Sequence, residues 1–242
     1  MDSDDEPLTL SALTLAALQE FKKEEEENVK KFNELKKRAE DEDQERKMTI
    51  HDFKEDWQLS QFWYNDSTAE ILGKAILQDA DENTVIAIAS APSVYAAIQK
   101  LPKSEVPTEQ IYCLEFDRRF EVLAGKNFVY YDYNDPHNLP AQVLHKCHRV
   151  LIDPPFLEEE CQKKSAIAAR NMLVEDLSQK TISGALQYRL ITSTGERMGP
   201  VVKTNYPDTE ITDFFPEHKN GLSNEFRCYA TFESDYWKFI KS

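Results

Sequence analysis

The sequence predicts an α/β protein whose mostly parallel sheet has helices on both faces. Two observations support this fold class. Short, almost wholly apolar runs recur between residues 84 and 194, as expected for strands that are buried on both faces. Segments with helical spacing of apolar residues separate these runs, and such alternation is typical of parallel strands joined by crossover helices. The 242 residues are enough for a sizeable core.

Charge divides the chain at residue 56. Residues 1–56 hold 18 acidic and 10 basic side chains, a net charge of −8 out of −15 for the whole sequence. Residues 11–21 predict a short amphipathic helix, and residues 22–47 predict a solvated helix or a disordered arm because their apolar positions are sparse. We therefore expect a charged, largely helical or disordered extension over 1–56 and a folded domain over 57–242. The extension is interpreted as a solvated segment, with a partner-recognition arm as the alternative.

The elements of the domain follow in a regular order. Ser67 and Glu70 have the spacing of a capping box, which predicts a helix that begins at Ser67. Two final strands are expected over residues 210–219 and 225–234, paired antiparallel at the end of the sheet. Between these ends, strands are expected over 84–90, 110–116, 128–133, 149–153 and 188–194, and helices over 93–101, 141–147 and 158–174.

The residues that follow the first two strands indicate a nucleoside ligand, because such sheets bind ligands at the carboxyl ends of their strands. Residues 90–93, Ser-Ala-Pro-Ser, stand where a phosphate-binding fold has glycines, which favours a ligand without phosphates. Glu115 lies 25 positions beyond Ser90, and an acid at about this spacing accepts hydrogen bonds from ribose hydroxyls. Asp117 is the alternative acceptor. Either acid could instead pair with Arg118 or Arg119.

The third and fourth strands also end in acids. Asp132 and Tyr133 follow the third strand, and an acid there can accept a hydrogen bond from the exocyclic amine of adenine. Asp153 ends the fourth strand and precedes Pro154, Pro155 and Phe156. Each proline fixes φ at about −65° and lacks a backbone N–H, so the segment is rigid and presents acceptors beside an aromatic face. Such a segment can orient an amine towards an electrophile; the alternative is that it only terminates the strand.

Six stretches of the sequence resemble, in order, the elongation factor 1A lysine methyltransferase family. The similarity spans about residues 57–233, reaches residues 10–21 and points to the fungal branch of that family. Asp-Pro-Pro-Phe by itself resembles the (Asp/Asn/Ser)-Pro-Pro-(Tyr/Phe) motif of class I S-adenosylmethionine-dependent amino methyltransferases. The family was first labelled as N6-adenine-specific DNA methyltransferases because of this motif. The six stretches are WQLSQFWY (57–64), SAPSVY (90–95), EFDRRF (115–120), YDYNDP (131–136), DPPFLEEEC (153–161) and NEFRCY (224–229).

This resemblance implies a Rossmann-like, seven-stranded class I methyltransferase domain whose last strand is antiparallel. It implies methyl transfer from S-adenosylmethionine to a lysine of elongation factor 1A, with the amine held by Asp153, Pro154, Pro155 and Phe156. Aromatic side chains at 62–64 are expected either to cover the cofactor, to line the amine pocket or to belong to the core. The implied cofactor-binding residues are Phe62, Trp63, Ser90, Ala91, Pro92, Ser93, Glu115, Asp117, Asp132 and Tyr133.

Composition narrows the class of protein further. The net charge of −15 disfavours a free-standing DNA-binding protein and suits a basic partner. The four cysteines form no CxxC pair, and the group His145, Cys147 and His148 lacks the second half of a zinc site, so we expect free thiols and no metal. No stretch approaches the about 20 apolar residues of a membrane span, and the acidic N-terminus is unlike a signal peptide. We expect a cytoplasmic monomer that does not bind a membrane.

Three functions remain open at this point. The first is a protein-lysine methyltransferase, and the second is an adenine N-methyltransferase that acts on nucleic acid, since the same motif orients either amine. The third is a non-catalytic binding module that retains the fold. The acidic charge and the five motifs other than Asp-Pro-Pro-Phe favour the first function.

Overall fold

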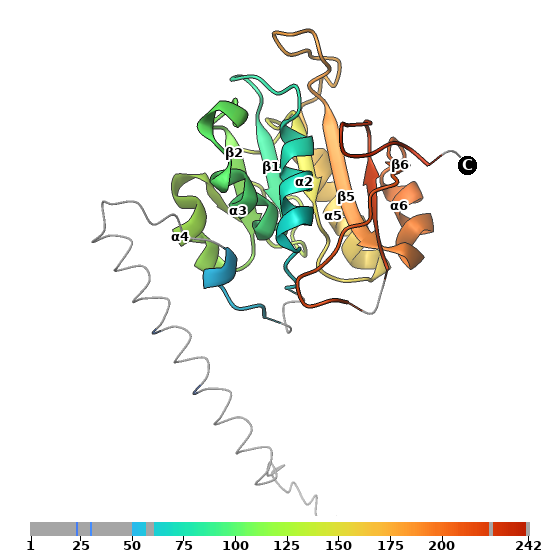
Figure 1. Ribbon diagram of the computed structural model, residues 1–242. Helices are drawn as coiled ribbons and strands as arrows, with labels where there is room; N and C mark the ends of the chain where they lie inside the picture. The colour runs from blue at the N-terminus through green and yellow to red at the C-terminus, as the bar shows by residue number, and fades with distance from the viewer. Residues whose placement is uncertain (1–22, 24–29, 31–49, 57–60, 223–224, 241–242) are drawn as a thin grey trace, which may run out of the picture. The chain divides into compact units, whose positions relative to one another are not determined.

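The computed structural model describes residues 23, 30, 50–56, 61–222 and 225–240. The expected helix over 11–21 and nearly all of the charged run over 22–47 lie outside this part of the chain. The described residues form a seven-stranded sheet in the order β3-β2-β1-β4-β5-β7-β6 (Figure 1). Neighbouring strands from β3 to β5 pair in parallel, and β7 runs antiparallel to both of its neighbours. This topology confirms the predicted fold class.

The expected strands are all present, with shifted ends. The strands are β1 (Ile86–Ala89), β2 (Ile111–Glu115), β3 (Phe128–Tyr130), β4 (Arg149–Ile152), β5 (Arg189–Gly195), β6 (Glu210–Ile211) and β7 (Phe226–Ala230). The α-helices are α2 (Asp66–Leu77), α3 (Pro92–Lys100), α4 (Glu121–Ala124), α5 (Glu159–Met172) and α6 (Gly199–Asn205). Single 3-10 turns are η1 (Ile50–Asp52), η3 (Lys103–Glu105), η4 (Arg118–Phe120), η5 (Gly125–Asn127) and η6 (Glu196–Met198).

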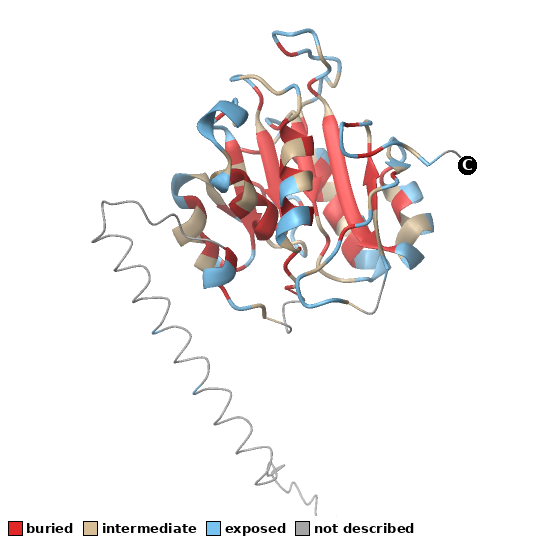
Figure 2. Ribbon diagram, viewed as in Figure 1, coloured by how far each residue is buried: buried red, intermediate tan, exposed pale blue. Residues whose placement is uncertain are grey.

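The sheet separates two apolar clusters. On one face, side chains of α2 and α3 such as Leu72, Ile76 and Ile98 pack against Ile88 and Leu151. Helices α5 and α6 cover the other face. Their buried residues Ala166, Ala169, Met172 and Val202 form one cluster with the strand residues Ala87, Ala89, Val150 and Ile152. Strands β1, β4 and β5 are therefore buried along their whole length, which Figure 2 shows in red. Burial on both faces explains why β1, and β4 after Arg149, are apolar without alternation.

A third, smaller cluster ties residues before 57 to the domain. The Phe53 ring stacks on Phe120 with centroids 4.7 Å apart, and Trp63 meets Phe120 edge-on at 5.6 Å. Ile50 and Ala96 complete this buried group. Ile50 and Phe53, which the sequence analysis placed in the extension, therefore pack together with residues of the folded domain.

The first helix of the domain, α2, begins one residue earlier than predicted, and its N-cap lies two residues before Ser67. Asn65 is its N-cap, and its side-chain oxygen accepts a hydrogen bond of 2.8 Å from the Thr68 amide. Ser67 is exposed, and Glu70 pairs with Lys74 one turn later. The capping-box interpretation of Ser67 and Glu70 is therefore wrong, because Asn is as good a cap as Ser and stands where the chain leaves its extended conformation.

The expected helix over 141–147 is wrong. This segment forms turns, and His145 has φ of 53°, a left-handed conformation that interrupts a helix. The amide groups of His145, Lys146 and Cys147 bind carbonyl groups of Asn171 and Met172 at the end of α5. The apolar residues that suggested a helix instead anchor the crossover, since Val143 and Cys147 are fully buried.

The C-terminal region also departs from the prediction in two places. Only Glu210–Ile211 of the expected 210–219 strand lies in the sheet. Beyond it the chain leaves the sheet, and His218 pairs with Tyr64 in an isolated antiparallel bridge. Helix α6 was not predicted, because its sequence GPVVKTN is short and carries two β-branched valines; Pro200 at its first turn was the available signal. Among the described residues, no helix is both long and apolar enough to cross a bilayer.

Candidate active site

The acidic strand ends meet at one edge of the sheet. The Ser90 amide binds the Leu114 carbonyl at 2.9 Å, and the Tyr131 amide binds the Glu115 carbonyl at 3.0 Å. The Asp153 amide binds the Ala89 carbonyl at 3.0 Å, which extends the β1–β4 ladder by one step. Strand order reverses between β1 and β4, and open α/β sheets bind their ligands at such a point. The residues that follow β1, β2, β3 and β4 are therefore brought together.

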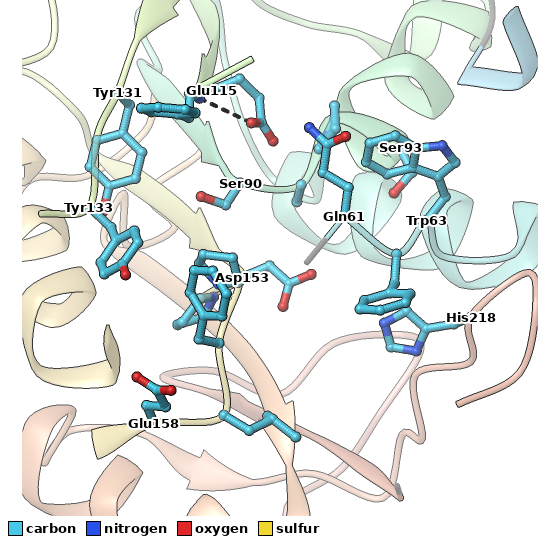
Figure 3. Close-up of a pocket in the computed structure, with 18 of the residues that line it drawn as sticks. Gln61, Trp63, Ser90, Ser93, Glu115, Tyr131, Tyr133, Asp153, Glu158 and His218 are labelled. Carbon is cyan, nitrogen blue, oxygen red and sulfur yellow. Dashed lines mark hydrogen bonds between the residues drawn. The ribbon is translucent and has the colours of Figure 1, made fainter. Parts of the chain in front are cut away.

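A cavity of about 580 Å³ opens at this edge (Figure 3). All the predicted site residues except Asp117 line this cavity. Figure 3 shows Asp153 between Glu115 and Ser90 on one side and His218 on the other. The lining residues are Gln61, Phe62, Trp63, Ser90, Ala91, Pro92, Ser93, Glu115, Phe116, Tyr131, Asp132, Tyr133, Asn134, Asp153, Pro154, Pro155, Phe156, Leu157, Glu158, His218, Leu222 and Phe226.

The turn after β1 takes a glycine-like shape without glycine. Ser90 has φ of 55°, in the left-handed region that favours glycine. Ala91 and Ser93 are buried, and Pro92 is the first residue of α3, where the missing proline N–H costs nothing. The result is a tight turn that points the N-terminus of α3 at the cavity, which is favourable for a carboxylate group of a ligand.

Glu115 is a buried carboxyl group that faces the cavity. It is 6% exposed, and one of its oxygens accepts a hydrogen bond of 3.1 Å from the Phe116 amide. Burial, and then the negative charge of Asp117, raise the pKa of Glu115 to about 8. A carboxyl group in this position gains from hydroxyl donors, so it suits a ribose diol.

Asp117 lies outside the cavity and has a structural partner instead. Arg119 Nε donates to its carboxylate at 2.8 Å, and Gln61 Nε2 donates at 3.0 Å. Burial alone would raise the pKa of Asp117, but the hydrogen bonds from Arg119 and Gln61 lower it below the ordinary value. Of the two acids that the sequence left open for the ribose, Glu115 is the one that faces the cavity.

Asp132, Tyr133 and Phe116 form another part of the wall. Asp132 Oδ1 accepts a hydrogen bond of 2.8 Å from the Asn134 amide, which fixes the carboxylate after β3. Phe116 is 48% exposed and lies 5.7 Å from the Tyr130 ring. An exposed aromatic ring beside a cavity that also holds Glu115 and Asp132 suits the face of an adenine base. Sequence analysis missed Phe116, although its place directly after Glu115 was a signal.

The Asp153-Pro154-Pro155-Phe156 segment forms the opposite wall. Asp153 is partly exposed to the cavity, and burial raises its pKa to about 7 while the hydroxyl group of Tyr64 acts to lower it. The Phe156 ring lies 5.7 Å from Tyr133, and both rings line the cavity that Asp153 also lines. The sequence left open whether this segment orients an amine or only terminates the strand. Its place in the cavity wall favours the first possibility, because a strand terminator need not line a cavity.

The aromatic residues at 62 and 63 divide between cavity and core. Phe62 is partly buried and lines the cavity. Trp63 also touches the cavity but is 3% exposed, and its Nε1 donates to the Phe53 carbonyl at 3.4 Å. Trp63 is therefore mainly a core residue whose ring closes one side of the site.

His218 is a site residue that the sequence did not reveal. Its ring lies 4.8 Å from Tyr64 and 4.4 Å from Phe226, and burial lowers its pKa to about 4, so the imidazole is neutral near pH 7. It reaches the cavity because Asn65 N binds Glu217 O at 2.9 Å and Lys219 N binds Trp63 O at 2.8 Å. These pairings join segments about 150 residues apart, and no local pattern could indicate them.

Comparison with known proteins agrees with this geometry. The family model described as "Probable N6-adenine methyltransferase" matches residues 55–234. Protein-lysine N-methyltransferase EFM5 of Saccharomyces cerevisiae is 57% identical over 234 residues, which cover 96% of this chain and 94% of that protein. EEF1A lysine methyltransferase 1 of Gallus gallus is 38% identical, with 97% of this chain and 99% of that protein covered.

The chain belongs to the elongation factor 1A lysine methyltransferase family. The human EEF1A lysine methyltransferase 1 is also similar, at 34% identity over 96% of this chain and 95% of that protein. The 57% identity to the yeast protein agrees with the fungal branch that the sequence motifs pointed to. Membership in this family makes the chain an S-adenosylmethionine-dependent methyltransferase.

A solved structure supports the fold of this lysine methyltransferase family member. A branched-chain polyamine synthase variant from Thermus thermophilus, in complex with N4-aminopropylspermidine and 5'-methylthioadenosine, matches with a TM-score of 0.50 at 11% identity. The match covers 74% of this chain and 59% of that chain. At this identity the likeness concerns the fold alone.

The cavity of the family member fits S-adenosylmethionine. Glu115 offers a buried carboxyl group with unused acceptor capacity for ribose hydroxyls, and Phe116 offers an exposed ring for the adenine. Asp132 can accept from the exocyclic amine, and the turn at Ser90 with the α3 N-terminus can receive the methionine carboxylate. Each part of the cofactor thus has a matching group at the sheet edge.

Proposed function

We propose that this protein transfers methyl groups from S-adenosylmethionine to the ε-amine of a lysine in translation elongation factor 1A. We further propose that it works as a monomer in the cytoplasm and that nucleic acid is not its substrate. The support for the lysine substrate comes from the relatives. Their names state protein-lysine or EEF1A lysine methylation, and their sequences match nearly the full length of this chain.

The observation that carries the proposal is the place of Asp153. Its carboxyl group lines the same cavity as Glu115 and Asp132, and Figure 3 shows it between Glu115 and His218. The cofactor-binding residues and the amine-binding segment therefore face one another across a space large enough for both reactants. A lysine side chain is long and thin, and it can enter such a space without unstacking a base from a duplex.

The lysine amine must be neutral to act as a nucleophile, although free lysine has a pKa of about 10.4. The pocket can lower that pKa because Phe156, Phe226 and the neutral His218 exclude water from the ammonium group. Asp153 and the carbonyl groups of the proline segment can then accept hydrogen bonds from the amine N–H groups. This arrangement leaves the nitrogen lone pair directed away from Asp153, towards the cofactor half of the cavity.

S-adenosylmethionine, when bound, supplies an electrophilic methyl group on a positively charged sulfur. Positive charge develops on the lysine nitrogen as the new C–N bond forms. The rings of Phe156 and Tyr133 can stabilise that charge by cation–π contact, at about 0.5–2 kcal/mol for each ring. Asp153 stabilises the same charge when it is ionised.

A methyl-transfer assay tests the proposal. The purified full chain is incubated with radiolabelled S-adenosylmethionine and, in separate reactions, with elongation factor 1A, duplex DNA and structured RNA. We expect label in elongation factor 1A, and peptide mapping should place it on one lysine whose replacement by arginine removes the signal. An Asp153→Ala preparation with the same melting temperature serves as the matched control.

Two results would contradict the proposal in different ways. Label that enters DNA or RNA but not elongation factor 1A would identify the protein as an adenine methyltransferase, as the description of the matching family model implies. Titration calorimetry with millimolar cofactor and no heat of binding would instead identify a non-catalytic module that retains the fold.

A further inference from the structure

Tyr64 lies beneath the amine-binding side of the site. Its side chain is 2% exposed and does not line the cavity, so it neither covers the cofactor nor contributes an aromatic wall, as the sequence analysis considered. The ring packs in the apolar cluster that contains Leu151, Ile191 and Cys228. A backbone bridge to His218 and a ring contact of 4.8 Å with the same residue fix the position of Tyr64.

Strand register directs Asp153 and Ser193 towards this tyrosine. Strands β4 and β5 pair in parallel with Ile152 opposite Thr192, so Asp153 and Ser193 are the next neighbours along the ladder. Side chains alternate between the two faces of a sheet. Asp153 and Ser193 therefore share the face of Leu151 and Ile191, which is the face against which Tyr64 packs.

The Tyr64 hydroxyl is sealed from solvent and makes no hydrogen bond of full geometry to any described residue. The polar side chains that act on it are Asp153 and Ser193. The Ser193 hydroxyl is also buried and also has no hydrogen-bond partner among the described residues. Buried hydroxyl groups are nearly always hydrogen-bonded in folded proteins, because leaving one unpaired is costly. Two buried hydroxyl groups without a partner and the Asp153 carboxyl group therefore lie on one face of the sheet.

We propose that Tyr64 is a positioning residue for Asp153: its hydroxyl donates a hydrogen bond to the carboxylate from beneath the pocket, and Ser193 donates in turn to the tyrosine oxygen. This inference rests on the amine-binding role proposed for Asp153. The bond occupies one carboxylate oxygen and orients the other towards the substrate amine. It also favours the ionised form of Asp153, in which both carboxylate oxygens can accept hydrogen bonds.

The charges around Asp153 agree with this role. Burial, and then the charge of Asp153, raise the pKa of Tyr64 well above its ordinary value, so the phenol remains a donor throughout the neutral range. The other titratable groups that sense Asp153 are Glu115 at the end of β2, Cys161 in α5 and Cys228 in β7. A carboxyl group and two thiols are neutral or negative in every protonation state, so none of the three brings a positive charge to Asp153. The hydroxyl of Tyr64 is the contact that opposes the effect of burial on the carboxyl group.

The test is a pH titration of the Asp153 carboxyl group in the full, cofactor-free chain, followed by NMR of ¹³C-labelled aspartate and assigned with Asp153→Asn. We expect the midpoint to rise by about one pH unit in Tyr64→Phe, which keeps the ring and loses the donor. Tyr206→Phe is the matched control, because Tyr206 is also a buried tyrosine with an unpaired hydroxyl but packs on the opposite face of the sheet. Its midpoint should equal that of the parent.

A second variant protects the test against misfolding of Tyr64→Phe. Ser193→Ala removes the donor to the phenol oxygen, which weakens the bond that the phenol makes, so the Asp153 midpoint should rise by a smaller amount in the same direction. In the methyl-transfer assay, the acidic limb of the pH profile of kcat/KM should move upward in both variants and stay in place in Tyr206→Phe.

The outcomes separate this inference from the proposed function. An unchanged Asp153 midpoint in Tyr64→Phe, or in Ser193→Ala if Tyr64→Phe does not fold, overturns the positioning role whatever the substrate is. A raised midpoint in a protein that methylates no lysine would leave the role of Tyr64 intact and remove the proposed function, because the titration needs no substrate.

Discussion

Asp153 and Glu115 illustrate at the scale of single residues how this site is prepared for its ligands. Burial is the main cause that raises the pKa of Asp153 to about 7 and that of Glu115 to about 8. The ionised form of each carboxyl group is less stable in its buried position than it would be in water. The folded protein accepts this cost because the groups face a cavity in which amine and hydroxyl donors can replace water.

Replacement of Asp153 by alanine should separate activity from stability. We expect Asp153→Ala to reduce kcat/KM for lysine methylation at least about 100-fold, because the amine loses the acceptor that orients it. The free energy of unfolding should fall by less than about 1 kcal/mol, since the lost group is destabilised by burial. Steady-state kinetics and thermal unfolding of the same preparation check both expectations. Full activity in this variant would refute the role of Asp153.

The raised pKa values also predict how stability depends on pH. Between pH 6.5 and 8 the folded chain keeps protons on Glu115 and Asp153 that the unfolded chain, with ordinary pKa values of 4.5 and 3.8, has already released. The folded state therefore binds more protons, and its stability falls as pH rises through this window. His218, with a lowered pKa, has the opposite influence only below about pH 6.5. Urea unfolding of the cofactor-free protein measures the slope.

Glu115→Gln is the control for that slope. The amide cannot titrate, so the decrease between pH 6.5 and 8 should become shallower, while cofactor affinity should fall about 10-fold or more because the hydrogen bonds to ribose weaken. A slope equal to that of the parent would show that Glu115 ionises normally in the folded protein.

At the scale of elements, the start of α2 depends on Asn65. Asn65→Ala should lower the free energy of unfolding by about 1 kcal/mol, because the Thr68 amide loses its acceptor. Ser67→Ala is the matched control: Ser67 is exposed, and its replacement should change stability by less than about 0.5 kcal/mol. Chemical denaturation of the two variants decides between them. A larger loss in Ser67→Ala would restore the capping box that the sequence suggested.

Sequence patterns predicted the elements best where burial alone dictates the residues. Strand β1 is apolar throughout and β4 is apolar after Arg149 because both faces are covered, and the order of the strands along the chain predicted the sheet. The prediction failed where long-range contacts decide. Residues 141–147 have helical spacing, but the carbonyl groups at the end of α5 capture their amides.

The same distinction holds for the candidate site. Glu115, Asp132 and Asp153 could be predicted because each lies within two residues of the end of a strand, and parallel strands end at a common edge. His218 and Tyr64 could not be assigned, since their positions depend on an antiparallel pairing between distant segments. The choice between Glu115 and Asp117 needed the structure, which shows Arg119 and Gln61 bound to Asp117.

At the scale of the whole molecule, the boundary of the folded domain can be tested by truncation. Removal of residues 1–48 should leave cofactor affinity unchanged, because every described residue that lines the cavity comes after residue 60. Removal of residues 1–56 also deletes Ile50 and Phe53, which uncovers Phe120 and Trp63 and should lower the free energy of unfolding by about 3–5 kcal/mol. Calorimetry with S-adenosylmethionine and thermal unfolding compare the two. A large loss of affinity after removal of 1–48 would place the extension in the cofactor site.

The pairing of His218 with Tyr64 has a consequence for the order in which the protein folds. The residues that we propose for cofactor binding come mainly from the ends of β1, β2 and β3, which are near one another in the sequence, whereas the proposed amine side needs a contact that spans about 150 residues. Contacts of such long sequence separation form late, since closing a long loop costs entropy before the contact repays it. A ribosome must therefore release nearly the whole chain before the substrate side of the pocket can close, and nascent chains shorter than about 220 residues should be enzymatically silent.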